Sequence, residues 1–258
     1  MIDYHMHTYF SDGKNSHEEM LTSAAYKGLS EIGFSDHICL KPVGWATKLE
    51  AIPAMRNRII SIKEDETTPI KVKFGAEVDY IKGLTKEIGE LITSLPLDYC
   101  IGSVHFIDDW NFDTDIAPYD GIDIDAFYNR YFALVEESAK SGLFDIIGHA
   151  DLAKKFAYYP SFDLNPYYEH AAKVFKEANV VVEVNTSGRI KPCKEFYPSA
   201  QFVNALVKHR VPLTLGSDAH VEQNVGQFFA DAINELRALG VKELVRFTNR
   251  KREFYRID

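Results

Sequence analysis

The chain begins with MIDYHMHTYFSDG at residues 1–13, which joins a short β-like run to two histidines and a turn. In a strand, residues i and i+2 point to the same face, so His5 and His7 project together while Met6 faces the other way. Two imidazoles at this spacing can chelate one metal ion. The SDG turn then directs the chain toward His17, which opens the next helical pattern. Alone, an HxH pair does not identify a metal site.

More residues with metal-binding side chains follow later β-like runs, close to where each run ends. They are His37 in GFSDHI, Glu77 in FGAEVDY, His105 in IGSVHF, His149 in IIGHAD, and Asp218 and His220 in LGSDAH. Imidazole and carboxylate are the usual ligands of catalytic zinc, manganese and iron. This recurrence predicts a metal site. His170 and His209 instead fall within helical patterns, and we interpret them as surface residues.

β-Branched or aromatic runs alternate with amphipathic segments, which predicts seven strand–helix repeats. The expected strands are 1–7, 31–36, 71–80, 99–106, 146–149, 180–185 and 212–217; the expected helices are 17–27, 52–65, 85–93, 125–141, 166–178, 199–209 and 225–239. Because no glycine-rich phosphate loop follows the first strand, a Rossmann sheet is disfavoured. We predict an α/β fold, a distorted TIM-like (β/α)7 barrel formed by a single domain over residues 1–258. The metal site would lie at the C-terminal ends of its strands.

Composition narrows the functional class. The 258 residues are 46% hydrophobic and 26% charged, with a net charge of −9 and scattered Lys and Arg, which argues against nucleic acid as a partner. Three cysteines without a CxxC pair indicate a reducing compartment. The N-terminus has no basic region typical of a signal peptide, and no window has the roughly 18 to 20 apolar residues of a membrane span. A cytoplasmic protein without a membrane partner is expected.

Two further segments stand outside the repeat. The Asp-rich stretch 108–125 directly follows His105 and is expected to be a long loop, a kind of segment that often serves as a lid. The basic, alternating stretch 243–257 predicts an edge strand or hairpin, to which we assign no chemistry.

The number of candidate ligands indicates more than one ion. Nine ligands exceed the three protein groups and one open position that a single catalytic ion typically takes, so two or three ions sharing a carboxylate fit the count. Such ions would outweigh the two carboxylates and leave a cationic pocket, which suits a phosphate dianion. They would also supply a low-pKa water and stabilise charge on the phosphoryl oxygens.

Basic residues beside the predicted site could bind that phosphate. Arg189 and Lys191, in NTSGRIKP, follow the sixth strand and could clamp it, although a solvated basic loop is the alternative interpretation. Lys154 and Lys155, directly after GHAD, are further candidates of the same kind.

Acidic residues have two possible roles. Asp36 and Asp151 flank candidate ligand histidines and would orient the imidazoles, or one of them would protonate the leaving oxygen. The aspartates of 108–115 could meet a cationic substrate group, although a solvated acidic loop is the plainer interpretation.

The ordered motifs HMH, SDG, His17, SDH, AEVD, GSVH, GHAD, EVNTSG and GSDAH, from Ile2 to His220, resemble the PHP (polymerase and histidinol phosphatase) family. The resemblance implies a (β/α)7 barrel with three divalent metal ions, which would be zinc, manganese or iron. It implies a first ion held by His5, His7, Glu77 and Asp218, a second held by Glu77, His105 and His149, and a third held by His17, His37 and His220.

Within this family, the stretches IGSVHFIDDWNFD and EVNTSGRIKPCKEFYPS and the compact length are similar to the histidinol-phosphate phosphatases. This similarity implies hydrolysis of L-histidinol phosphate, a small phosphomonoester, to L-histidinol and phosphate in histidine biosynthesis. Arg189 would help to hold the phosphate, and an acidic residue such as Asp113 would recognise the amine or the imidazole.

Three other functions remain open from the sequence. A phosphoesterase of other specificity, acting on phosphotyrosine, on general phosphomonoesters or on nucleotides, would keep the fold and change the loops. A module serving a DNA polymerase would predict a longer chain or a basic groove. A metal-binding protein without catalysis would release no phosphate from a generic aryl phosphate.

Overall fold

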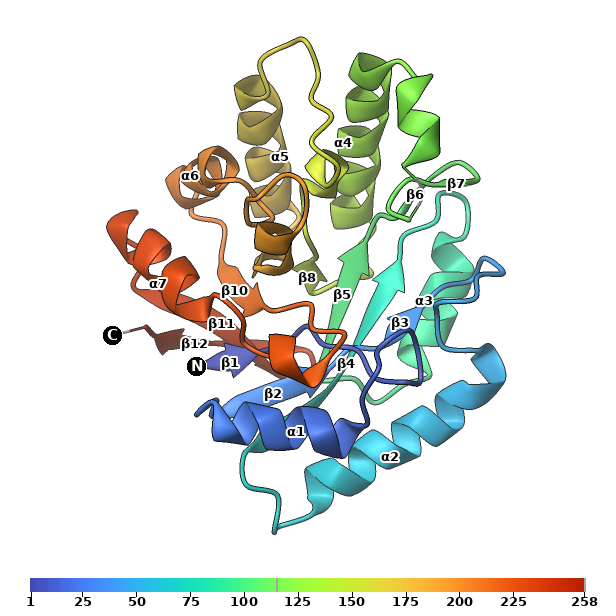
Figure 1. The fold of residues 1–258 in the computed structure, drawn as a ribbon, viewed down its shortest axis with the longest axis vertical. Helices are drawn as coiled ribbons and strands as arrows, with labels where there is room; N and C mark the ends of the chain where they lie inside the picture. Colours follow the sequence, from blue (N-terminus) through green and yellow to red (C-terminus); the bar gives the residue numbers. More distant parts are fainter. Residues whose placement is uncertain (115, 258) are drawn as a thin grey trace.

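The computed structural model of the protein describes residues 1–114 and 116–257, and its main sheet is parallel (Figure 1). In that part of the chain the strand order is β1 (Ile2–Asp3), β2 (Glu31–Phe34), β4 (Lys71–Asp79), β5 (Tyr99–Ser103), β8 (Ile146–Ile147), β9 (Val181–Asn185) and β10 (Leu213–Gly216), with β3 (His37–Ile38) also beside β4. The Tyr4 N–H donates to the Leu215 carbonyl at 3.4 Å, and a parallel bridge joins Met6 to Ala219. The first strand thus meets the last. This confirms the predicted (β/α)7 barrel.

Helices surround this sheet, as Figure 1 shows. Within the described residues they are α1 (His17–Tyr26), α2 (Ile52–Glu64), α3 (Thr85–Thr93), α4 (Ile124–Lys140), α5 (Asn165–Glu177), α6 (Ala200–Lys208) and α7 (Phe229–Ala238). Local chemistry sets where several begin. Ser16 and Glu19 form a reciprocal capping box at α1, and the Ser199 hydroxyl accepts from the Phe202 N–H at α6. Among the residues described, every helix falls short of the length and apolar content needed to cross a bilayer.

Aromatic side chains fill the barrel at the amino-terminal ends of the strands. The rings of Tyr4 and Tyr99 stack with centroids 4.5 Å apart, and the Tyr99 hydroxyl donates to the Tyr4 carbonyl at 2.6 Å. Tyr99 needs glycine beside it, because a Cβ on Gly33 or Gly75 would lie 2.0 or 2.2 Å from its ring or hydroxyl atoms. Glycine at positions 33 and 75 therefore gives the Tyr99 ring its place in this layer.

The C-terminal segment closes this end of the barrel. β11 (Glu243–Thr248) and β12 (Lys251–Arg256) form an antiparallel pair, which confirms the predicted hairpin. Val245 and Phe247 are buried in the same apolar cluster as Tyr4 and Tyr99. The hairpin therefore seals the end of the barrel opposite the strand carboxyl ends.

The Asp-rich stretch 108–125 is more ordered than the predicted loop. β6 (Phe106–Ile107) and β7 (Trp110–Asn111) pair as a short hairpin, a 3-10 turn follows at Ala117–Asp120, and α4 begins at Ile124. The rings of Trp110, Phe112 and Tyr119 pack on Phe127 of α4 at centroid distances of 5.4 to 5.5 Å. These aromatic residues, which alternate with the aspartates, hold the segment against α4. The prediction of a loop rested on the aspartates and did not take the aromatic residues into account. Asp115 lies outside the described residues.

The hairpin gives a prediction about stability. We expect Phe247→Ala to lower the free energy of unfolding by about 3–5 kcal/mol, because a buried ring is lost and a cavity remains. The matched control is Phe254→Ala on β12, where the side chain is 55% exposed and the expected change is within about 0.5 kcal/mol. Urea unfolding followed by circular dichroism measures both. Equal losses in the two variants would contradict the assigned role of the hairpin.

Candidate metal centre

The carboxylate of Glu77 on β4 is the meeting point of the candidate ligands. It is 1% exposed, and its Oε2 lies 2.7 Å from His37 Nδ1 and 3.1 Å from His5 Nε2. Its Oε1 lies 2.8 Å from His149 Nε2 and accepts a hydrogen bond from the Ser103 hydroxyl at 2.6 Å. Imidazoles from three other segments therefore converge on a single buried carboxylate.

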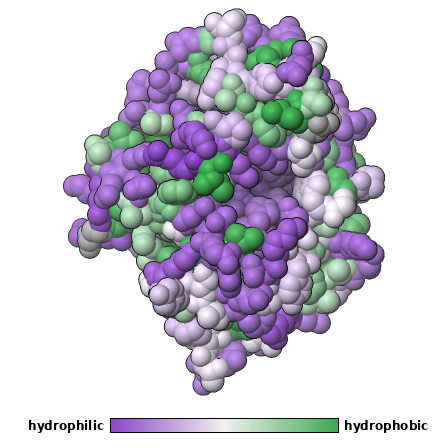
Figure 2. Space-filling model, in the orientation of Figure 1, coloured by the Kyte–Doolittle hydropathy of each residue, from purple (hydrophilic) through white to green (hydrophobic). Residues whose placement is uncertain are grey.

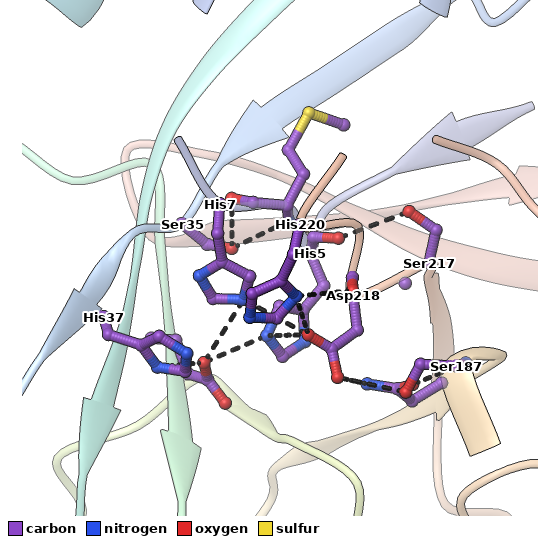
Figure 3. A network of polar contacts seen from close by, with 12 residues as sticks. His5, His7, Ser35, His37, Ser187, Ser217, Asp218 and His220 are labelled. Carbon is purple, nitrogen blue, oxygen red and sulfur yellow. Dashed lines mark hydrogen bonds and ion pairs between the residues drawn. The ribbon is translucent and has the colours of Figure 1, made fainter. Parts of the chain in front are cut away.

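His5 and His7 lie together on the first strand segment, as their spacing predicted, and Asp218 faces both (Figure 3). Asp218 Oδ1 lies 3.2 Å from His7 Nε2 and 3.8 Å from His5 Nε2. Its other oxygen accepts hydrogen bonds from the Ser187 hydroxyl at 3.1 Å and from the Asn185 amide at 3.2 Å. These two donors leave Oδ1 directed at the imidazoles.

A second group surrounds Asp12, in the SDG turn. Asp12 Oδ1 lies 3.2 Å from His220 Nε2 and 3.6 Å from His37 Nε2. The His7 ring stacks on His37, with centroids 4.1 Å apart, and lies tilted against His220 at a centroid distance of 4.3 Å. His7, Asp12, His37 and His220 each offer one ligand atom within 4.8 Å of the others.

A third group lies on the other side of Glu77. His37, Glu77 and His105 also offer ligand atoms within 4.8 Å of one another. The rings of His105 and His149 are 5.0 Å apart. His105 directs Nε2 toward Glu77 Oε1 at 3.7 Å, while its Nδ1 lies 3.0 Å from Asp79 Oδ1.

The electrostatics of the cluster favour anionic carboxylates. Burial alone would raise the pKa of Glu77, but the imidazoles of His37 and His5 outweigh it and hold that pKa well below its ordinary value. Burial, with His37 and His220 nearby, lowers the pKa of His7 to about 3. At His220 burial acts in the same direction, but Asp12 and Asp218 prevail and raise the pKa to about 9.

The donor set fits divalent metal ions. Several buried ligand atoms form no hydrogen bond within the described part of the chain: His5 Nε2, His7 Nε2, Asp12 Oδ1, His37 Nδ1 and Glu77 Oε2. Buried polar atoms without hydrogen bonds are costly, and a cation between them would remove that cost. Imidazole nitrogen and carboxylate oxygen are the ligands that zinc, manganese and iron accept.

Backbone strain marks two of the ligand positions. His149 has φ of 25° and Asp218 has φ of 53°, a region that residues other than glycine rarely adopt. Such a conformation costs about 1–3 kcal/mol and persists only where the surroundings enforce it, as at many functional sites.

His17 does not join the cluster, contrary to prediction. It opens α1 and is fully buried, but its ring packs edge-on against Phe34 and beside Phe10 at centroid distances of 4.5 and 5.6 Å. Its nearest carboxylate oxygen in the described chain belongs to Asp36, 3.9 Å away. Asp12, in the SDG turn before this helix, lies beside His37 and His220 instead. From the sequence, SDG was interpreted only as a turn, although its aspartate could have been considered as a further metal ligand.

Asp36 is also placed differently from the expected acid catalyst. One oxygen accepts from the Thr8 N–H at 2.7 Å and the Ser11 hydroxyl at 2.7 Å, and the other accepts from the Thr8 hydroxyl at 2.9 Å. The side chain is fully buried and fastens the loop that carries Asp12. Asp36 therefore holds the loop that carries Asp12 in position and does not itself face the cavity. The other flanking acid, Asp151, lies 3.0 Å from Lys154 and accepts from the Ser199 N–H.

Two predicted phosphate ligands are engaged elsewhere. Arg189 forms an ion pair with Glu235 and lies over the Phe196 ring at 4.2 Å. Lys154 is 2% exposed, with Nζ 2.8 Å from both Glu195 Oε2 and the Phe196 carbonyl. Tertiary ion pairs, which the motifs NTSGRIKP and GHAD do not reveal, hold both cations away from the cluster.

Other predicted residues do line the cavity beside the cluster. This cavity of about 440 Å³ is lined by Glu77, His105 and His149 together with Lys155, Lys191 and Asp113. Lys155 Nζ lies 2.6 Å from Asp113 Oδ1 and also donates to the Asp113 carbonyl. Burial would raise the pKa of Asp113, but Lys155 and His105 hold it below its ordinary value. Figure 2 shows a hollow bordered mainly by hydrophilic residues, near where β4 and β5 end in Figure 1.

Comparisons with known proteins bear on the family and on the fold. The family model of the PHP domain matches residues 3–187. A probable histidinol-phosphatase of Deinococcus radiodurans is 36% identical over 97% of this chain and 98% of its own, and the histidinol-phosphatase of Lactococcus lactis is 26% identical over 97% and 95%. A crystal structure of the L. lactis histidinol phosphate phosphatase with zinc, L-histidinol and phosphate superposes with a TM-score of 0.83 and 22% identity, over 98% of each chain.

The placement of Asp12 and His17 gives a prediction. We expect Asp12→Asn to weaken zinc binding by about tenfold or more, because losing even an outer partner of a ligand typically costs about 10–100-fold. His17→Gln should keep the zinc content of the unaltered protein, since the His17 ring packs on Phe34 and away from Glu77. Metal analysis after equilibration with buffered zinc measures both. Loss of zinc from His17→Gln alone would reverse the assignment.

Proposed function

The chain belongs to the PHP domain family, and from this we propose that it is a histidinol-phosphatase, hydrolysing L-histidinol phosphate to L-histidinol and phosphate. The observation that carries the proposal is the buried Glu77 carboxylate, whose imidazole partners face a cavity containing two lysines. The relative from D. radiodurans, similar along nearly its whole length, supports the substrate.

We propose three divalent ions at this cluster, and its donor atoms support three ligand sets, two of which share Glu77. The first is His5, His7, Glu77 and Asp218, the second is Glu77, His105 and His149, and the third is Asp12, His37 and His220. When bound, the ions would supply a water of low pKa and offset the charge of the phosphoryl oxygens.

Two lysines would bind the phosphate from the cavity side. Lys155 and Lys191 both line the cavity, whereas Arg189 and Lys154 are held in ion pairs. The carboxylate of Asp113 would keep the Lys155 ammonium directed at the cavity, close to His105 and His149. Because Lys155 already neutralises it, Asp113 would orient the lysine more than attract the substrate amine. Hydrogen bonds from a lysine ammonium to a phosphate are stronger than hydrogen bonds between neutral groups, because both partners are charged.

We also propose a cytoplasmic location and a small molecule as the partner of the site. Cys39, Cys100 and Cys193 are buried and free of disulfides within the described residues, as in a reducing compartment. The net charge of −9 opposes binding to a nucleic-acid backbone.

Steady-state phosphate release tests the function. L-Histidinol phosphate is compared with p-nitrophenyl phosphate and phosphotyrosine, on protein of measured metal content. The proposal expects kcat/KM for histidinol phosphate to be orders of magnitude above the others and to be lost in His105→Ala. Comparable slow rates on all three substrates would assign another phosphomonoester. No hydrolysis by fully metal-loaded protein would reject a phosphomonoesterase.

The phosphate-binding role of Lys155 is tested separately. We expect Lys155→Met to lower kcat/KM about 10- to 100-fold, because a hydrogen bond to a charged group contributes about 1.5–3 kcal/mol. Arg189→Met is the matched control, and it should change kcat/KM less than threefold, since Arg189 pairs with Glu235. Michaelis–Menten kinetics at constant metal content measures both. A larger loss of kcat/KM in Arg189→Met than in Lys155→Met would assign phosphate binding to Arg189 instead.

A further inference from the structure

A second buried carboxylate, Glu183 on β9, lies behind the cluster. It is 1% exposed, and its Oε1 lies 2.6 Å from His5 Nδ1. Its Oε2 accepts the His149 backbone N–H at 3.0 Å and the Asn185 side-chain amide at 3.2 Å. One side chain thus contacts two candidate ligands that come from different strands.

The neighbouring strands leave room for this carboxylate. A Cβ on Gly216 of β10 would lie 1.9 Å from Glu183 Oε1 and 2.6 Å from His5 Cβ. A Cβ on Gly148, just after β8, would lie 3.6 Å from Glu183 Oε2 and 2.7 Å from the Ser103 hydroxyl. Glycine at position 216 therefore allows the contact between Glu183 and His5 inside the barrel, whereas a Cβ at position 148 would clash with Ser103 and Ile101 and only touch Glu183.

We propose that Glu183 is a positioning residue for the metal centre, acting through the ring of His5 and the backbone of His149. The proposal rests on the metal centre of the proposed function. By accepting the Nδ1 proton of His5, Glu183 holds the tautomer in which Nε2 carries the free lone pair, toward Glu77 and Asp218. By accepting the N–H of His149, it helps to hold a residue with φ of 25°.

The arrangement requires a carboxylate, because its two oxygens accept from three donors: the His5 ring, the His149 backbone and the Asn185 amide. Glutamine has the size of glutamate, but it offers one acceptor oxygen and one NH2 group. In either orientation its NH2 would face a donor. Aspartate keeps both acceptors but is one methylene shorter.

Zinc affinity of metal-stripped, refilled protein tests the role. We expect Glu183→Gln to bind zinc about 10- to 100-fold more weakly than the unaltered protein, the usual cost of losing an outer partner of a ligand. The zinc affinity of Glu183→Asp should lie between that of Glu183→Gln and that of the unaltered protein. A side chain that only filled space would give the reverse order, since Gln matches Glu in size and Asp does not. Competition with a zinc chelator gives the affinities, and elemental analysis gives the stoichiometry.

Glu31→Gln is the matched control. Glu31 is also a buried glutamate of a barrel strand, but it binds the Tyr4 hydroxyl at the opposite end. We expect its zinc affinity to stay within threefold of the unaltered protein. Circular dichroism and urea unfolding of the stripped proteins verify folding, and Glu183→Asp carries the test if Glu183→Gln does not fold.

A spectroscopic measurement separates positioning from packing. In protein labelled with 15N-histidine, the ring of His5 should be protonated at Nδ1, with its signal assigned by loss in His5→Gln. Glu183→Gln should shift that signal. Unchanged zinc affinity in Glu183→Gln, or tighter binding than in Glu183→Asp, would overturn the proposal. A zinc-loaded protein without histidinol-phosphate hydrolysis would reject the proposed function, while the zinc affinities would still decide the role of Glu183.

Discussion

The whole site depends on one buried anion, the Glu77 carboxylate at the centre of the barrel. Burying it would be costly without opposite charge or good donors, and His5, His37 and His149 surround it at 2.7 to 3.1 Å. Glu77 lies on β4, the strand that pairs in register with His37 on one side and with β5 on the other. The parallel sheet therefore brings ligands from separate repeats to one carboxylate.

The barrel interior divides into two regions with opposite chemistry. At the strand amino ends, Tyr4 and Tyr99 pack with the β11–β12 hairpin into an apolar plug. Toward the carboxyl ends the interior is polar, and Glu183 stands beside the histidines with glycine at its neighbours. The apolar plug stabilises the barrel, so that strained positions such as His149 can persist near the cavity.

Ion pairs decide which cations can reach a substrate. Lys154 and Lys155 are adjacent in sequence, yet one is buried against Asp151 and Glu195 and the other lines the cavity beside Asp113. Arg189, likewise, is paired with Glu235, whereas Lys191 lines the cavity. In the proposed function, recognition of the phosphate would therefore depend on the acidic partners of these side chains as much as on the basic residues themselves.

The sequence by itself determined the barrel and the order of its strands and helices. It also pointed to nine ligands, of which the structure gathers eight, Glu77 among them, into one cluster. It did so because strand periodicity directs side chains to one face and parallel strands end at one edge. Only the tertiary structure decided that Asp12 faces the site while His17 is buried beside Phe34, and that Arg189 and Lys154 are held elsewhere. Those outcomes depend on turns and on ion pairs between distant segments, which no local pattern encodes.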